Sequence, residues 1–122
     1  MALTVNHPLL KEVRVYAYAA DISTASSAFT VSPIRGKVVE VGSVIYAAIT
    51  TANAAITTEI AGTAITGGSF TITQSGSAAG DVDSAVPTAA NNVAEGQNIE
   101  FISDGGSDTT CPAMFYAVIQ AA

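Results

Sequence analysis

The sequence predicts an all-β protein, a single-domain antiparallel β-sandwich. Three observations support this prediction. Apolar and polar residues alternate with a period of two in most segments that could form regular structure, which is the pattern of half-buried strands. Glycine-rich connections separate these segments. The chain has no tryptophan and one cysteine, whereas an immunoglobulin-like sandwich usually has a core tryptophan and paired cysteines. A jelly roll is therefore the preferred topology.

The first half of the chain predicts three strands. In residues 12–20 the odd-numbered positions face one side, and Arg14, Tyr16 and Tyr18 face the other. A short strand over 28–31 ends before a proline. Residues 37–50 form the longest apolar run and are rich in β-branched residues, so they predict a long strand with a bulge at Gly42. A helix over residues 43–50 is the alternative.

The second half predicts five more short strands around one long loop. Residues 55–60, 63–66 and 69–73 are expected to form three of them. The composition then changes to small residues over 75–97, which predicts a long loop with a helical turn at 88–94 after a proline. Strands over 98–103 and 113–120 follow, joined by the glycine-rich connection at 104–108.

The alternation also predicts which side chains fill the core. Large apolar residues at the inward positions of these strands are expected to be buried. They are Val13, Val15, Val39, Val41, Ile56, Ile60, Phe70, Ile72, Ile99, Phe101 and Val118.

Residues 1–10 are expected to form a flexible N-terminal arm, and residues 11–122 the β-sandwich domain. The arm, MALTVNHPLL, has no strand or helix period but contains several apolar residues. We expect it to become ordered when it contacts a partner, which would bury apolar surface at a cost in backbone entropy. The candidate partner contacts are Leu3, Val5, Leu9 and Leu10 in the arm, and the outward Tyr16 and Tyr18.

Composition and charge restrict the partners. Only 11% of the residues are charged and the net charge is −6, so much of the surface is neutral and is expected to be covered by other copies or by another protein. A homo-oligomer, either a dimer or a trimer, is predicted. Four basic residues cannot form a nucleic-acid or membrane-surface patch. The absence of a long apolar run and of a signal pattern predicts synthesis in a cytoplasm.

No arrangement of residues indicates catalysis, so we expect the chain not to be an enzyme and to use no cofactor. His7 is the single histidine, and zinc or copper sites need several histidine or cysteine ligands. Cys111 is expected to be a buried small side chain without a base to activate it. Two carboxylate groups, at 81 and 83 and at 104 and 108, could ligate calcium, but roles in turns explain them more simply.

Residues 36 to the end resemble small capsid decoration, or cement, proteins of tailed bacteriophages, which are of jelly-roll type. The resemblance rests on three stretches and a terminal strand. The stretches are GKVVEVGSVIYAAIT, ANAAITTEIAGTAI and GGSFTITQSGSAAGDVDSAVPTAANNVAEGQNIEFISDGGSD. Together they cover about two thirds of the chain. The resemblance lies in strand-rich segments of small residues and in a loop signature, rather than in an active-site motif.

The resemblance implies a virion protein on the outer surface of a phage capsid, made in the host cytoplasm. Its partners would be the major capsid protein and further copies of itself, and its function would be to cement neighbouring capsid subunits. Two alternatives remain open. One is a phage tail, fibre or head-fibre module, and the other is a carbohydrate-binding β-sandwich, whose sugar platforms usually need exposed tryptophan or tyrosine.

Overall fold

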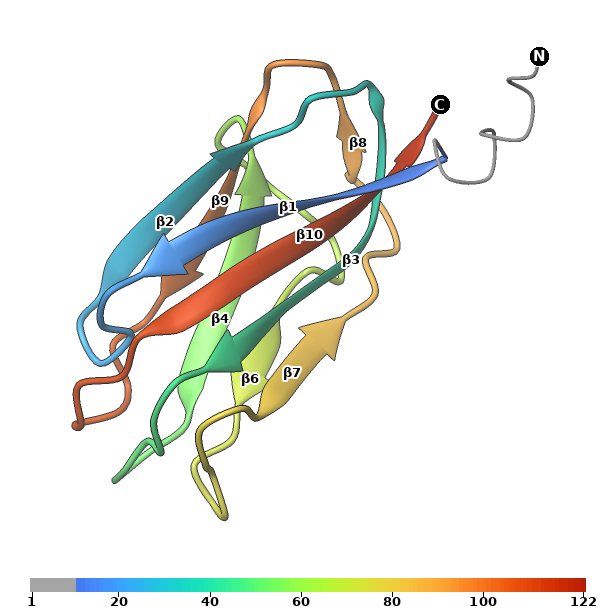
Figure 1. Ribbon diagram of the computed structural model, residues 1–122. Helices are drawn as coiled ribbons and strands as arrows, with labels where there is room; N and C mark the ends of the chain where they lie inside the picture. The colour runs from blue at the N-terminus through green and yellow to red at the C-terminus, as the bar shows by residue number, and fades with distance from the viewer. Residues whose placement is uncertain (1–10) are drawn as a thin grey trace.

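The structure is a computed structural model that describes residues 11–122 (Figure 1). Within this range the chain forms ten strands and no helix, arranged as two five-stranded antiparallel sheets packed face to face. The predicted antiparallel β-sandwich is confirmed. The arm expected over residues 1–10 lies outside the described residues.

The first sheet is at the front in Figure 1 and contains the first and last strands of the sandwich. Its order is β1 (Glu12–Ala19), β10 (Ala113–Ala121), β3 (Gly36–Ile45) and β7 (Val82–Ala85), and β8 (Asn92–Val93) also pairs with β3. The strand β10 is therefore central, between β1 and β3. The strand β1 is at the edge of the sheet.

The second sheet lies behind the first. Its order is β2 (Ser26–Val31), β9 (Asn98–Ser103), β4 (Ala54–Ile60) and β5 (Thr63–Ala64), and β6 (Phe70–Ile72) also pairs with β4. The connections from β1 to β2, from β3 to β4 and from β9 to β10 each pass from one sheet to the other. Such crossovers are typical of Greek-key and jelly-roll sandwiches.

The core lies between the two sheets and is centred on three phenylalanines. The ring of Phe101 on β9 stacks on that of Phe115 on β10, with centroids 5.1 Å apart and planes at 6°. Phe70 on β6 approaches the ring of Phe115 edge-on at 6.5 Å. Isoleucines, valines and alanines of both sheets complete a contiguous buried cluster around them.

Most of the predicted buried positions are confirmed, but Val39 is wrong. The register between β10 and β3 shifts so that Val38 pairs with Ile119 and Glu40 pairs with Val118. Val39 is the extra residue of a β-bulge and only half-buried, whereas Val38 is fully buried. The predicted bulge was at Gly42, three residues too late for this irregularity. Val118 is buried but does not belong to the core cluster.

The predicted long loop at 75–97 is also partly wrong. It contains β7 and β8, which extend the first sheet along β3, and no helical turn forms at residues 88–94. An isolated bridge between Thr66 and Ala89 connects this segment to the chain between β5 and β6. The predicted strand over 37–50 ends at Ile45, and no part of it is helical.

Candidate binding surfaces

Apolar side chains form a row across the outer face of the first sheet. The register places Tyr18 of β1 beside Met114 of β10, Met114 beside Val44 of β3, and Val44 beside Val82 of β7. Tyr18 and Val82, at the two ends of the row, are 56% and 61% exposed. Just beyond the end of β3, the ring of Tyr46 lies 6.4 Å from that of Tyr18.

The neighbouring row adds two more tyrosines. The register places Tyr16 of β1, which is 57% exposed, beside Tyr116 of β10, and Tyr116 beside Gly42 of β3. We call the combined surface the tyrosine face. It consists of Tyr16, Tyr18, Val44, Tyr46, Val82, Met114 and Tyr116.

Tyr116 is held in one orientation by its neighbours. Its hydroxyl donates a hydrogen bond to Glu40 at 2.8 Å, and the Arg14 guanidinium lies 5.9 Å from its ring centroid. The ring covers Gly42, because a Cβ atom at that position would be 2.5 Å from the Tyr116 hydroxyl oxygen. Burial and the adjacent Glu40 raise the pKa of Tyr116, so the hydroxyl remains a neutral donor.

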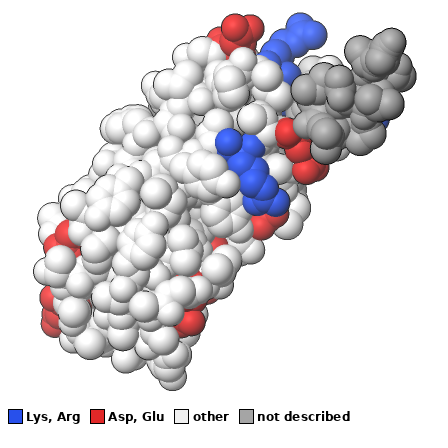
Figure 2. All heavy atoms as spheres, viewed as in Figure 1, with Lys and Arg blue, Asp and Glu red and all other residues white. Residues whose placement is uncertain are grey.

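The residues of the tyrosine face are all uncharged, and within residues 11–122 charged side chains contact it only at Tyr116. Arg14 and Glu40 lie in the next row, beside Val118, and mark one end of the face. In Figure 2 the lysine and arginine atoms lie in the upper part of the view, whereas the lower part is mostly uncharged with acidic atoms along its margins. The outer face of the second sheet is different, since Glu59 and Glu100 are directly opposite each other on β4 and β9.

The structure places two of the sequence-predicted contact residues, Tyr16 and Tyr18, together on this face. The other four, Leu3, Val5, Leu9 and Leu10, lie outside the described residues. Sequence reasoning missed the contributions of Tyr46, Met114 and Tyr116. The even-numbered outward positions of the last strand could have indicated two of them, but only the register with β1 shows that they adjoin Tyr16 and Tyr18.

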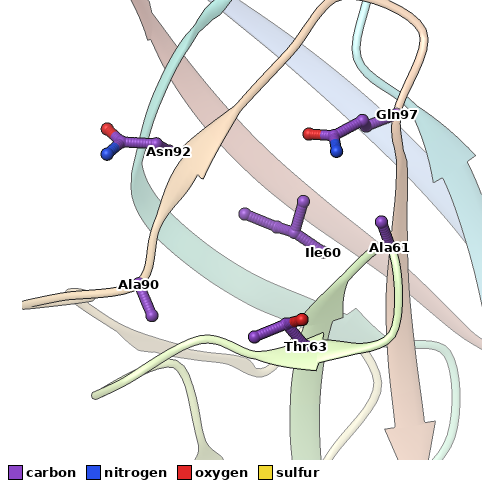
Figure 3. A pocket seen from close by; sticks show the side chains of 6 residues that line it. All are labelled: Ile60, Ala61, Thr63, Ala90, Asn92 and Gln97. Carbon is purple, nitrogen blue, oxygen red and sulfur yellow. The ribbon is translucent and has the colours of Figure 1, made fainter.

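A pocket of about 450 Å³ opens at the other end of the sandwich, between the β4–β5 hairpin and the chain around β8 (Figure 3). Its lining is Ile60, Ala61, Thr63, Ala90, Asn92 and Gln97. All six side chains are uncharged, and the polar ones can both donate and accept hydrogen bonds. The side-chain oxygen of Gln97 accepts a hydrogen bond from the backbone N–H of Ala94 at 2.8 Å, which leaves its NH₂ group for other contacts.

Two of the residues that line this pocket have an unusual backbone conformation. Ala61 has φ 49° and Ala90 has φ 51°, in the left-handed region that residues with a Cβ rarely adopt. Such strain is found more often at functional sites than elsewhere. It marks the pocket as a second candidate site, after the tyrosine face.

Two of the four carboxylates considered as calcium ligands, Asp81 and Asp104, accept hydrogen bonds from backbone N–H groups. Asp81 accepts a hydrogen bond from the Ala78 N–H at 2.9 Å, and Asp104 accepts from the N–H groups of Ala55 and Gly106 at 3.0 and 2.9 Å. Across residues 11–122, no group of three or more histidine, cysteine, aspartate or glutamate side chains is placed to hold a metal ion.

The remaining candidate groups for chemistry are structural or lie outside the described range. Cys111 is fully buried, as predicted, and its thiol donates to the Ala47 carbonyl at 3.2 Å. His7 falls in residues 1–10. In the part of the chain that the structure describes, no helix is long and apolar enough to cross a membrane.

Comparison with known proteins identifies the fold but no family. Neither a protein-family model nor a curated relative matches the sequence. Among solved structures, the C-terminal family 6 carbohydrate-binding module of LamC, a marine laminarinase from Zobellia galactanivorans, matches with a TM-score of 0.54 and 9% identity over 89% of this chain and 99% of that one. The family 35 module of Abf62 from Cellvibrio japonicus matches with a TM-score of 0.50 and 14% identity, over 84% and 71% of the two chains.

A catalytic-domain structure of a family 87 α-1,3-glucanase in complex with nigerose also matches, with a TM-score of 0.52 and 11% identity. This chain spans 86% of its own length in that alignment but only 22% of the glucanase chain. At these identities the likeness establishes a shared β-sandwich fold and nothing about ligands, because one fold supports many functions.

Proposed function

We propose that this chain is a non-catalytic structural protein that attaches through its tyrosine face to a larger protein assembly, and that this assembly is a phage capsid. One observation carries the proposal. An uncharged surface with three exposed tyrosines, Tyr16, Tyr18 and Tyr46, extends across the outer face of the first sheet.

The composition of the face favours a protein partner. The buried centres of protein interfaces are enriched in tyrosine and methionine and depleted in charged residues, and the tyrosine face has this composition. Met114 and Val44, next to Tyr18, offer apolar contact rather than hydrogen bonds.

The choice of a capsid as the assembly is supported by the sequence. The stretches from Gly36 to Asp108 resemble capsid decoration proteins, and the resemblance implies a module bound to a lattice of major capsid protein. Attachment to a lattice suits a small domain, because many copies engaged together hold far better than one alone.

The test is co-sedimentation with capsids purified from a phage that lacks this gene. The wild-type protein should pellet with the capsids. A double variant, Tyr16→Ala with Tyr18→Ala, should bind at least about 30-fold more weakly, since truncation of a central aromatic contact costs about 2 kcal/mol or more. The matched control is Phe29→Ala, which removes an aromatic ring that is 59% exposed on β2 of the second sheet.

The control should bind as the wild type does. Equal binding by the double variant would show that the tyrosine face is not the attachment surface. Failure of the wild-type protein to pellet would contradict the capsid proposal as a whole.

The second candidate function is carbohydrate binding. It is favoured by the fold, because the modules of LamC and Abf62 described above are carbohydrate-binding modules, and this support is more direct than any that the fold comparisons give to the capsid proposal. The uncharged pocket around Asn92 and Gln97 adds to it, since neutral amides are suited to sugar hydroxyls and Ile60 provides an apolar wall (Figure 3).

Affinity electrophoresis and pull-down with laminarin, xylan, cellulose and α-1,3-glucan separate the two candidates. Binding to a glycan that is weakened by Asn92→Ala, but not by the double tyrosine variant, would support a sugar site in the pocket. Absence of binding to all four, together with capsid binding, would support the first candidate.

A further inference from the structure

The free edge of the first sheet is the backbone of β1. Within residues 11–122, β1 pairs only with β10. The Ala121 N–H donates to the Lys11 carbonyl at 2.6 Å, so residues 11 and 121 form a hydrogen-bonded pair. Because the two kinds of pair alternate along an antiparallel ladder, the odd-numbered residues of β1 direct their N–H and C=O groups toward β10.

The even-numbered residues therefore direct theirs away from the sheet. These residues are Glu12, Arg14, Tyr16 and Tyr18, and none has a backbone partner within the described range. They are also the residues whose side chains lie on the outer face. The unpaired backbone groups and the outward side chains, including Tyr16 and Tyr18, thus belong to the same four residues.

Natural proteins usually protect such an edge with lysine, proline, a bulge or a covering segment. The strand β1 has eight residues, pairs with β10 in unbroken register and contains neither lysine nor proline. Its charged residues, Glu12 and Arg14, are confined to the first half. The stretch from Val15 to Ala19 is uncharged, so no charged side chain there opposes pairing with another strand.

We propose that a second copy of this chain occupies the edge, and that the two β1 strands pair antiparallel about a two-fold axis, with Tyr16 opposite the partner's Tyr16. The sequence of β1 fits this register on both sides of the axis. Arg14 comes opposite the partner's Tyr18, where an arginine and an aromatic ring attract each other. Glu12 lies beyond the overlap, so no like charges face each other.

The pairing joins the two front sheets into one. The even-numbered backbone groups of both copies form about six new hydrogen bonds, two for each of the three hydrogen-bonded pairs. The two tyrosine faces become continuous, which doubles the uncharged surface on one side of the dimer. This inference concerns the edge and not the ligand of the face, so it can fail without affecting the proposed function.

The first test is amide hydrogen exchange of the full-length wild-type protein, measured by NMR without any capsid at two protein concentrations. The amides of Val15 and Ala17 are bonded to β10 and should exchange slowly at both. Those of Arg14, Tyr16 and Tyr18 should exchange at least about tenfold more slowly at the higher concentration, because only the dimer protects them.

The second test uses sedimentation equilibrium on two variants of the same residue. Arg14→Pro removes an N–H that faces the free edge and leaves the ladder to β10 intact, whereas Arg14→Ala removes only the side chain. The wild type and Arg14→Ala should be dimers, and Arg14→Pro a monomer with an unchanged circular dichroism spectrum.

Four results would overturn the proposal. They are a wild-type monomer at high micromolar concentration, a trimer, a dimer whose even-numbered amides stay unprotected, and protection of those amides that does not depend on concentration. The last would mean that the chain's own residues cover the edge. Because the exchange measurement needs no variant, the proposal remains testable even if Arg14→Pro does not fold.

Discussion

The substitution Phe101→Ala tests the centre of the core directly. Phe101 is fully buried and its ring is stacked on Phe115. Truncation of a buried phenylalanine typically costs about 3–5 kcal/mol, and loss of the ring stacking favours the upper end of this range. With an unfolding entropy of about 2.1 cal/mol/K per residue, or about 0.26 kcal/mol/K for 122 residues, the melting temperature should fall by about 12–20 °C.

The matched control is Phe29→Ala, because it deletes the same atoms from a ring that is 59% exposed. Its melting temperature should change by no more than a few degrees, since exposed sites usually shift stability by about 0.5 kcal/mol or less. Thermal unfolding followed by circular dichroism measures both variants under the same conditions. If Phe101→Ala melts within a few degrees of the wild type, or if the control is equally destabilised, the assignment of the inner and outer faces of the second sheet is wrong.

Substitutions at three further positions test the local geometry by urea unfolding. Gly42→Ala would place a Cβ atom 2.5 Å from the Tyr116 hydroxyl oxygen and should cost about 1–3 kcal/mol; unchanged stability would show that the ring does not cover this glycine. Burial, followed by the charge of Asp81, raises the pKa of Asp83 in the folded state above its value in the unfolded state. The free energy of unfolding therefore falls as pH rises from the unfolded pKa through the folded pKa. Asp83→Asn should therefore raise stability at neutral pH and have little effect below the unfolded pKa, and a loss at neutral pH would contradict this sign. Asp104→Ala removes the acceptor of two backbone N–H groups and should cost about 1–2 kcal/mol, whereas Asp104→Asn should retain most of that stability.

The strands themselves were largely predictable from local pattern. Alternation alone gave the inner and outer faces of β1, the inward Ile56 and Ile60 of β4, and the inward Phe70 and Ile72 of β6. These assignments succeed because a strand buried on one face must alternate, so the signal is contained in a few adjacent residues.

Features that depend on pairing between distant segments were not predictable. The bulge at Val39 arises where β3 pairs with β10, about 80 residues later in the chain, and glycine, the residue that usually indicates a bulge, is at position 42 instead. The strands β7 and β8 are short and lie in a segment of small residues, so their own sequence favours a loop. They form strands because their backbones pair antiparallel with the edge of β3.

The candidate site was half predictable for the same reason. Tyr16 and Tyr18 could be recognised as outward residues of one strand, but the surface they belong to is assembled from four strands. Met114 joins it from the last strand, and Val82 from a segment that the sequence predicted to be a loop. The sequence therefore identified two of the four tyrosines of the face but not its extent.

The two outer faces of the domain differ in charge. Glu59 and Glu100 face each other across the outer side of the second sheet, an arrangement that is tolerable only where water screens the repulsion. Burying that side against a partner would desolvate both carboxylates at considerable cost. The residues of the tyrosine face carry no charge that would have to be desolvated, and removal of its apolar surface from water is favourable. The asymmetry favours a module that docks with its first sheet toward the partner and keeps its acidic second sheet in solvent. Neighbouring modules on a lattice would then present like charges outward, which opposes stacking of a second layer upon the first.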